Sequence, residues 1–311
     1  MSHSLFLSTQ KAVITLTAVS ALAFSQLSNA AFSQIISFGD SLSDTGNIFA
    51  LTQGTNPTAP YVDGNFSNGD IWLDYLGDSL NTGTQSASLV GGTNYAWGGA
   101  RTSTAGNDGQ PSAQDQVAGY LGTNTVDPNA LYTILIGGND INAWNGFTYT
   151  SSDVAAAGLA AAGLAQTLIT AGAQSIMVLN VPDVGAAPVA PAGFESIITN
   201  LSLTFNSNLA TGLAGLDQNI VTLVDLFSIG QAISANVGSN GLTNVDDACL
   251  TLSGVCANPD EYLYWDALHP TTAAHALIAD AALATVVPVP AALPLMIFAL
   301  SGLFGARKLR S

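Results

Sequence analysis

Four short runs of apolar residues, rich in β-branched side chains, constrain the fold of this chain more than any other feature of its sequence. They cover residues 34–38, 131–136, 175–180 and 219–225. Each run is too short for a helix and is bounded by turn-forming residues, as buried parallel strands are. Stretches typical of helices lie between or after them, at 151–171, 196–213 and 270–284. Strands that alternate with helices predict one α/β domain with a parallel sheet covered on both faces.

Polar and glycine-rich segments follow three of these runs, where each predicted strand ends. They cover residues 39–47, 137–140 and 181–185. A fourth unusual segment, 265–270, comes just before the last predicted helix. In parallel α/β sheets, ligands bind in the loops at the carboxyl ends of the strands. We therefore expect the functional site in these four segments.

The first 30 residues are typical of a secretory signal peptide. Lys11 supplies the positive charge, residues 12–24 form a mostly apolar core, and Ser28 and Ala30 are the small residues of a cleavage site. This layout predicts that signal peptidase removes residues 1–30 and that the rest of the chain is exported. A functional domain would then cover residues 31–286.

Residues 287–311 have the layout of a C-terminal sorting signal. A Val-Pro-Val-Pro sequence at 287–290 breaks the chain, an apolar stretch covers 291–306, and basic residues follow it. The apolar stretch is shorter than the about 20 residues of a membrane-spanning helix. The segment resembles the PEP-CTERM signals of bacteria with a Gram-negative envelope, with Val289 where the motif has glutamate. That resemblance implies processing by an exosortase-type enzyme and delivery to the cell surface, outer envelope or extracellular matrix. A permanent C-terminal anchor is the alternative.

The charge of the domain between these two ends excludes one class of partner. All 21 acidic residues lie between Asp40 and Asp280, and Arg101 is the only lysine or arginine in that part of the chain. Nucleic-acid binding depends on Lys and Arg side chains that displace counterions from the phosphate backbone. Adhesion to an anionic bilayer likewise needs a basic patch. We therefore expect neither nucleic acid nor an anionic membrane surface as a partner of this domain.

The two cysteines, Cys249 and Cys256, predict a disulfide. They are the only cysteines of the chain, and an even number in an exported chain indicates pairing in an oxidising compartment. The bond would close a small loop before residues 265–270. Two cysteines without a nearby pair of histidines make a poor zinc site, so we expect no metal.

His269 is the candidate general base. Loss of His3 with the signal peptide leaves only His269 and His275. Asp266 precedes His269 by three residues, so its carboxylate can accept a hydrogen bond from one ring nitrogen and fix the tautomer of the other. His275 follows six residues later, about 240° further round a helix, and is predicted to be a surface or packing residue.

Ser41 is the candidate nucleophile, because it follows a predicted strand on a glycine-containing turn. Residues 39–43 read Gly-Asp-Ser-Leu-Ser and lack the second glycine of the α/β-hydrolase nucleophile elbow, Gly-x-Ser-x-Gly. A turn rich in Asp, Ser and Asn that caps a helix is the alternative for residues 39–47. This segment alone does not decide between the two.

Four segments together resemble the motif blocks of the GDSL, or SGNH, family of lipases and esterases. In chain order they read Phe-Gly-Asp-Ser-Leu-Ser-Asp-Thr-Gly-Asn (38–47), Asn-Tyr-Ala-Trp-Gly-Gly-Ala (94–100), Gly-Gly-Asn-Asp (137–140) and Asp-Ala-Leu-His-Pro (266–270). Val-Pro-Asp-Val-Gly (181–185) is similar to a further recurring segment of the family. The blocks occur in the family's order and span nearly the whole domain.

This resemblance implies both a fold and a reaction. The fold is a three-layer α/β/α sandwich of the flavodoxin-like type, with about five parallel strands. In the implied reaction, Ser41 attacks an ester carbonyl, His269 takes the serine proton and Asp266 orients His269. The substrate would be an ester or a lipid, and we expect no cofactor.

The resemblance also implies an oxyanion hole. Its donors would be the N–H of Ser41, the N–H of Gly98 or Gly99, and the side-chain amide of Asn139. Three other functions remain open at this point: an acyltransferase, a polysaccharide O-deacetylase of the same fold, and a non-catalytic surface or matrix protein.

Overall fold

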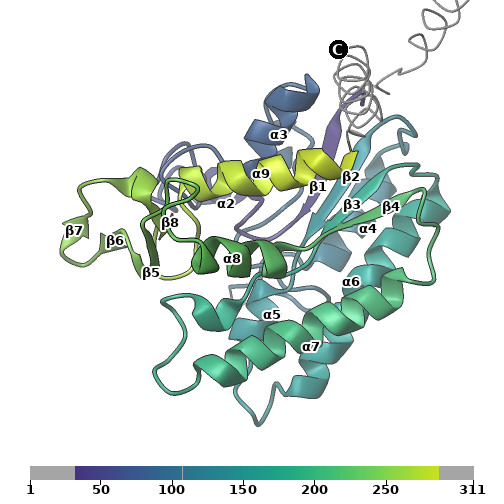
Figure 1. The fold of residues 1–311 in the computed structure, drawn as a ribbon. Coiled ribbons are helices and arrows are strands. Elements are labelled where there is room, and N and C mark those ends of the chain that lie inside the picture. Colours follow the sequence, from purple (N-terminus) through teal and green to yellow (C-terminus); the bar gives the residue numbers. More distant parts are fainter. Residues whose placement is uncertain (1–31, 107, 287–311) are drawn as a thin grey trace, which may run out of the picture. The chain divides into compact units, whose positions relative to one another are not determined.

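The central sheet of the structure confirms the predicted fold class. The computed structural model describes residues 32–106 and 108–286; the predicted signal peptide (1–30) and sorting segment (287–311) lie outside them. Four parallel strands form the sheet in the order β1-β2-β3-β4 (Figure 1). They are β1 (Ile35–Gly39), β2 (Leu131–Leu135), β3 (Ile176–Leu179) and β4 (Val221–Val224). Each strand overlaps one of the predicted runs.

A short parallel bridge extends the sheet beyond β1. Ser37 pairs with Asn94 in this bridge, and the Tyr95 N–H donates to the Ser37 carbonyl oxygen over 2.7 Å. The family resemblance implies about five parallel strands, whereas the described residues contain four in this sheet. The chain around Asn94 forms a single β-bridge with β1, and the Trp97 N–H also donates to the Gly39 carbonyl oxygen, but no full strand forms there.

Helices cover both faces of the sheet, which gives the predicted three layers (Figure 1). The helices α4 (Ala113–Thr123), α6 (Ser151–Ala171) and α7 (Glu195–Leu213) share one core cluster with alternate strand residues such as Ile36 and Ile134. The intervening strand residues, such as Ile35 and Leu135, share a second cluster with α3 (Trp72–Leu80), α8 (Leu226–Ala235) and α9 (Thr272–Val286). This division follows from the period of two along a strand.

The alanine-rich helix α6 packs closely because its residues are small. A Cβ added to Gly158 would lie 2.4 Å from the carbonyl oxygen of Phe205 on α7. Among the described residues, α6 alone is long and apolar enough to cross a membrane. However, Ala161, Ala165 and Leu168 on this helix are buried in the core. Packing inside the domain therefore accounts for the apolar, alanine-rich composition of α6.

The last helix, α9, begins later than the sequence predicts. We expected Pro270 in its first turn, but the helix starts at Thr272. Pro270 instead pairs with Tyr264 in an isolated bridge. The Thr271 hydroxyl accepts a hydrogen bond from the Ala274 N–H over 3.2 Å, and threonine is a favoured residue before the first helical turn. Thr271 therefore caps α9.

The remaining elements are short. They are the helices α2 (Asn47–Leu51), η2 (Ser88–Val90), α5 (Gly138–Asn142), η3 (Val184–Ala186) and η4 (Pro259–Glu261) and the strands β5 (Asn244–Ala248), β6 (Leu250–Thr251), β7 (Gly254–Val255) and β8 (Tyr262–Tyr264). β5 pairs with β8, and β6 pairs with β7 in an antiparallel hairpin. A disulfide joins Cys249 to Cys256 across this hairpin, as predicted.

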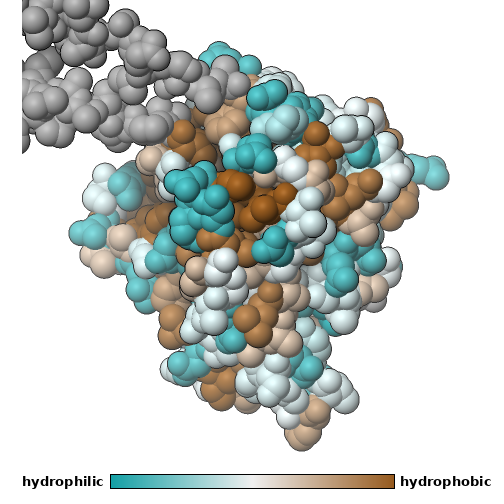
Figure 2. All heavy atoms as spheres, turned by 90° about the vertical axis from the view of Figure 1, so that its right-hand side faces the viewer, coloured by the Kyte–Doolittle hydropathy of each residue, from teal (hydrophilic) through white to brown (hydrophobic). Residues whose placement is uncertain are grey.

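Figure 2 shows one face of the molecule as a mixture of hydrophilic and hydrophobic side chains. Hydrophobic side chains gather near its middle and hydrophilic ones surround them. More than half of a folded protein's accessible surface is contributed by apolar atoms. Such a mixture is ordinary for the surface of a folded protein.

Candidate active site

The structure brings Ser41, Asp266 and His269 together. Ser41 lies in the loop after β1, and the other two lie between β8 and α9. The Ser41 hydroxyl oxygen is 2.8 Å from His269 Nε2, and His269 Nδ1 is 2.7 Å from Asp266 Oδ2. Nucleophile, base and orienting carboxylate within hydrogen-bond reach are the arrangement that activates a serine. All three side chains are residues that the sequence singled out.

Asp266 is held by four hydrogen bonds. Its Oδ1 accepts the N–H groups of Leu268 and His269 over 2.8 and 2.7 Å. Its Oδ2 accepts from His269 and from the hydroxyl of Tyr61, the latter over 2.6 Å. Burial acts to raise the pKa of Asp266, but the hydrogen bonds from His269 and Tyr61 and the nearby His269 outweigh it and lower the pKa to about 2. The carboxylate is therefore ionised at neutral pH and can stabilise a protonated His269.

Tyr61 is a site residue that the sequence analysis missed. It belongs to none of the four motif blocks, and it lies 205 positions from Asp266 in the chain. No spacing rule connects residues so far apart, so only the tertiary fold could identify it. The ring of Phe66, from the same loop, lies 5.3 Å from the ring of His269.

The start of the loop that carries Ser41 is hydrogen-bonded to α4 through Gly39, the last residue of β1. The Gln116 side chain accepts the Gly39 N–H and donates to the Gly39 carbonyl oxygen, both over 2.9 Å. Glycine is required at this position, since an added Cβ would lie 2.3 Å from the Leu135 carbonyl oxygen. Burial raises the pKa of the adjacent Asp40 to about 7, although the Leu42 N–H donates to its carboxylate. The hydrogen bonds from Gln116 therefore hold both the N–H and the carbonyl group of Gly39, two residues before Ser41.

The same loop also begins a helix, as the alternative interpretation of residues 39–47 requires. The buried Asp44 carboxylate accepts N–H groups from the start of α2, including that of Asn47 over 2.6 Å. Asn47 in turn donates to the carbonyl oxygens of Asn94 and Ala96. The turn thus has a capping role and places Ser41 as well. Its hydrogen bonds tie the first motif block to the second.

The two candidate glycines of the oxyanion hole differ in what their N–H groups do. The Gly98 N–H donates to Asp44 over 2.8 Å. Among the described residues, the N–H groups of Gly99 and Ser41 donate no hydrogen bond. The Asn139 side-chain amide uses one of its two hydrogens on the Ala100 carbonyl oxygen, over 2.9 Å. Ser41, Gly99 and Asn139 therefore each retain a donor for a ligand, whereas the Gly98 donor is already used.

His275 takes no part in the hydrogen bonds that join Ser41, His269 and Asp266, in agreement with its predicted packing role. Its side chain is buried in α9, and its Nδ1 has no hydrogen-bond partner among the described residues. Burial lowers the pKa of His275 to about 3. Within the described part of the chain, no group of three His, Cys, Asp or Glu side chains is placed to hold a metal ion.

Residues 35–282 match the sequence model of the GDSL-like lipase/acylhydrolase family. The chain belongs to this family. The match covers β1 through most of α9 and includes all four motif blocks. The family groups lipases and acylhydrolases.

Three curated relatives show how far the similarity of this GDSL-family chain extends. It is 32% identical to a protein from the trpE-trpG intergenic region of Pseudomonas putida, over 80% of this chain and 48% of that protein. It is 28% identical to the thermolabile hemolysin of Vibrio parahaemolyticus, over 79% of this chain and 62% of the hemolysin. It is 27% identical to the phosphatidylcholine-sterol acyltransferase of Aeromonas hydrophila, over 82% of this chain and 90% of the acyltransferase. The chain thus spans about half of the first relative and under two thirds of the second.

Proposed function

We propose that this protein cleaves carboxylic esters, with Ser41 as nucleophile, His269 as general base and Asp266 as the residue that orients His269. The observation that carries the proposal is the unbroken pair of hydrogen bonds, 2.8 Å from Ser41 to His269 and 2.7 Å from His269 to Asp266. Ser41 Oγ attacks the carbonyl carbon while its proton passes to His269 Nε2. His269 then protonates the departing alkoxide, which leaves an acyl-enzyme. Water activated by His269 releases the carboxylic acid.

The oxyanion of each tetrahedral intermediate would be bound by the N–H groups of Ser41 and Gly99 and by the Asn139 amide. Gly99 is preferred to Gly98 because the Gly98 N–H already donates to Asp44. Donors that are oriented before the reaction need no reorganisation as negative charge develops on the carbonyl oxygen.

Hydrolysis of p-nitrophenyl esters from acetate to palmitate tests the proposed activity, together with labelling by a fluorophosphonate probe. We expect hydrolysis of at least one ester and covalent labelling at Ser41, and both should vanish in Ser41→Ala. A protein that hydrolyses no ester and takes up no probe would contradict the proposal. That result would favour the non-catalytic surface or matrix protein.

Acyl transfer is a second candidate, favoured by the similarity to a phosphatidylcholine-sterol acyltransferase over 90% of that protein's length. An acyl-enzyme can pass its acyl group to an alcohol as well as to water. Adding an alcohol in increasing concentration to the reaction with a p-nitrophenyl ester distinguishes acyl transfer from hydrolysis. The measurement is the ratio of new ester to free acid, compared at equal amounts of released p-nitrophenol. Free acid as the only product would assign the protein to hydrolysis.

We also propose that the mature protein is exported and lacks residues 1–30. The signal-like composition of those residues and the Cys249–Cys256 disulfide support this, since disulfides persist in oxidising compartments. Removal of residues 287–311 by an exosortase-type enzyme is the matching proposal for the other end. Intact-mass measurement of protein from the cell envelope tests both. A mass that includes the last five residues would indicate a retained anchor, and unprocessed protein in the cytosol would contradict export.

A further inference from the structure

A largely aliphatic cavity opens directly beside Ser41. Its volume is about 390 Å³, within the range of pockets that hold small organic ligands. Aliphatic side chains from several elements line most of it, including Leu42, Leu135, Val184, Leu226, Ile229 and Ile278. They come from the loop after β1, from the end of β2, from η3, and from α8 and α9. The cavity is thus built where the carboxyl ends of the strands meet the helices of one face.

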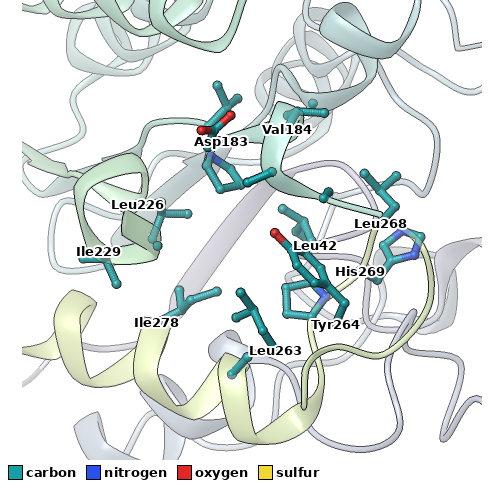
Figure 3. Close-up of a pocket in the computed structure, with 18 of the residues that line it drawn as sticks. Leu42, Asp183, Val184, Leu226, Ile229, Leu263, Tyr264, Leu268, His269 and Ile278 are labelled. Atoms are coloured by element: carbon teal, nitrogen blue, oxygen red, sulfur yellow. The ribbon is translucent and has the colours of Figure 1, made fainter. Parts of the chain in front are cut away.

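The cavity extends from the catalytic candidates toward helix α8. Figure 3 shows His269 at one end and Leu226 and Ile229 of α8 at the opposite end, with Leu42 and Ile278 between them. Ser41 also lines the cavity and lies 2.8 Å from His269. A ligand bonded to Ser41 can therefore extend away from the catalytic groups toward α8.

We propose that this cavity binds the acyl chain of the substrate, and that the preferred substrate is an ester of an aliphatic acid of medium length. This inference rests on the proposed ester-cleaving function. The lining argues against a sugar, whose hydroxyl groups would lose their hydrogen bonds to water among aliphatic side chains. One acidic residue of the lining, Asp183, already accepts from the Gly185 N–H and the Thr199 hydroxyl.

The order of the reaction favours the acyl chain over the alcohol as occupant. The acyl group stays bonded to Ser41 through both halves of the reaction, whereas the alcohol must depart so that water can enter. A recess that buries its occupant can stabilise both transition states of the acyl group. The same burial would slow departure of an alcohol held there.

The size of the cavity sets the expected trend with chain length. An acetyl group would leave most of the cavity empty. Each further methylene that becomes buried contributes up to about fourfold in kcat/KM, the fold-change that corresponds to about 0.8 kcal/mol. We therefore expect kcat/KM to rise at least about tenfold from the acetate to the octanoate ester, and to stop rising once the chain reaches α8.

Gly230 provides a way to fill the cavity without disturbing the fold. It lies on α8 four residues after Leu226, lines the cavity, and a Cβ added there meets no atom within 4 Å. Leucine is also a better helix former than glycine. Gly230→Leu should therefore shorten the cavity at the end far from His269. Gly163→Leu on α6 is the matched control, since an added Cβ there also meets nothing within 4 Å and Gly163 lies outside the cavity.

The test measures kcat/KM for two ester series on the purified full chain. The p-nitrophenyl esters from acetate to palmitate vary the acyl chain, and the alkyl acetates from ethyl to octyl vary the alcohol. In the wild type we expect the rise only in the acyl series. In Gly230→Leu the octanoate-to-acetate ratio should fall at least about tenfold, whereas Gly163→Leu should keep the wild-type ratio.

Each contrary result has a distinct meaning. A wild-type protein that labels with fluorophosphonate and cleaves acetate, but shows no rise with acyl length, overturns the acyl pocket and leaves the proposed function intact. A rise in the alcohol series alone overturns the assignment to the acyl chain. An octanoate-to-acetate ratio that is unchanged in Gly230→Leu overturns the placement of the acyl chain in this cavity. Absence of both labelling and hydrolysis overturns the proposed function and this inference together.

Discussion

The Asp44 carboxylate accepts a hydrogen bond from the Gly98 N–H over 2.8 Å, across 54 positions of sequence. The same carboxylate also accepts the N–H groups of Gly46, Asn47 and Ile48, at the start of α2. Asp44 thereby joins the loop that carries Ser41 to the loop that carries Gly99. This hydrogen bond occupies the Gly98 N–H, whereas the Gly99 N–H donates to no group among the described residues.

Asp44→Asn should lower both activity and stability. The substitution replaces one acceptor oxygen with an NH₂ group that faces buried N–H donors, and an unsatisfied buried donor costs about 1–3 kcal/mol. We expect kcat to fall about 10²-fold, with a smaller change in KM, because the two loops lose their alignment. Steady-state kinetics and thermal unfolding measure the two effects. A folded variant with the wild-type kcat would show that this link does not position the site.

The three residues of the proposed catalytic triad should differ in the loss that their removal causes. Ser41→Ala and His269→Ala should each reduce kcat by about 10⁴–10⁶, because triad members act as a unit. Asp266→Asn should leave more activity, since the serine and its base remain. Single-turnover and steady-state kinetics on a p-nitrophenyl ester measure the losses. Comparable activity in Ser41→Ala and wild type would exclude Ser41 as the nucleophile.

Asn139→Ala tests the side-chain donor of the proposed oxyanion hole. Removal of one such donor typically costs about 10²–10³ in kcat. The matched control is Asn142→Ala on the same short helix, where the asparagine is exposed and the wild-type rate should persist. Equal losses in the two variants would point to damage to α5 and not to a lost donor.

Tyr61→Phe should change the pH dependence of the reaction more than its maximal rate. The Tyr61 hydroxyl donates to Asp266 over 2.6 Å, and this bond helps to lower the pKa of that carboxyl. Without the donor, the pKa of the Asp266 carboxyl should rise toward its ordinary value. The acid limb of kcat/KM should therefore move to higher pH. Tyr75→Phe, which removes a hydroxyl that contacts Thr272 instead, should leave the profile unchanged; a shift in both variants would contradict the assignment.

His275 should affect stability and not catalysis. Burial lowers its pKa to about 3, so the unfolded chain, whose histidine titrates near 6.5, binds a proton that the folded chain does not. Below pH 6.5 this group lowers the free energy of unfolding by up to about 1.4 kcal/mol per pH unit, until the pH reaches about 3. His275→Leu should remove that part of the acid sensitivity and keep kcat/KM close to the wild-type value. Urea unfolding at several pH values measures the first effect, and a loss of activity as deep as in His269→Ala would overturn the choice of base.

Local patterns were sufficient to predict the layers and the partners that are close in sequence. The apolar runs predict β1 to β4 because burial on both faces demands continuous hydrophobic residues within a short strand. The three-residue spacing of Asp266 and His269 predicts their contact, because a single turn of the chain brings the two side chains together. The disulfide of Cys249 and Cys256 was predictable because these are the only two cysteines of the chain. Even the start of α9 at Thr272 was missed by only two residues.

Contacts between distant segments were decided by the tertiary structure alone. The motif resemblance proposed that Ser41 and His269 act together, but their 2.8 Å approach spans 228 positions and depends on how β1 and the β8–α9 loop pack. The Tyr61 hydroxyl donates to Asp266 and the Gly98 N–H donates to Asp44, and no sequence period relates the partners of either hydrogen bond. The aliphatic cavity likewise exists only where α8 and α9 meet the ends of the strands. Sequence periodicity determines which side chains are buried within an element, whereas the packing of elements determines which distant groups come within hydrogen-bond range.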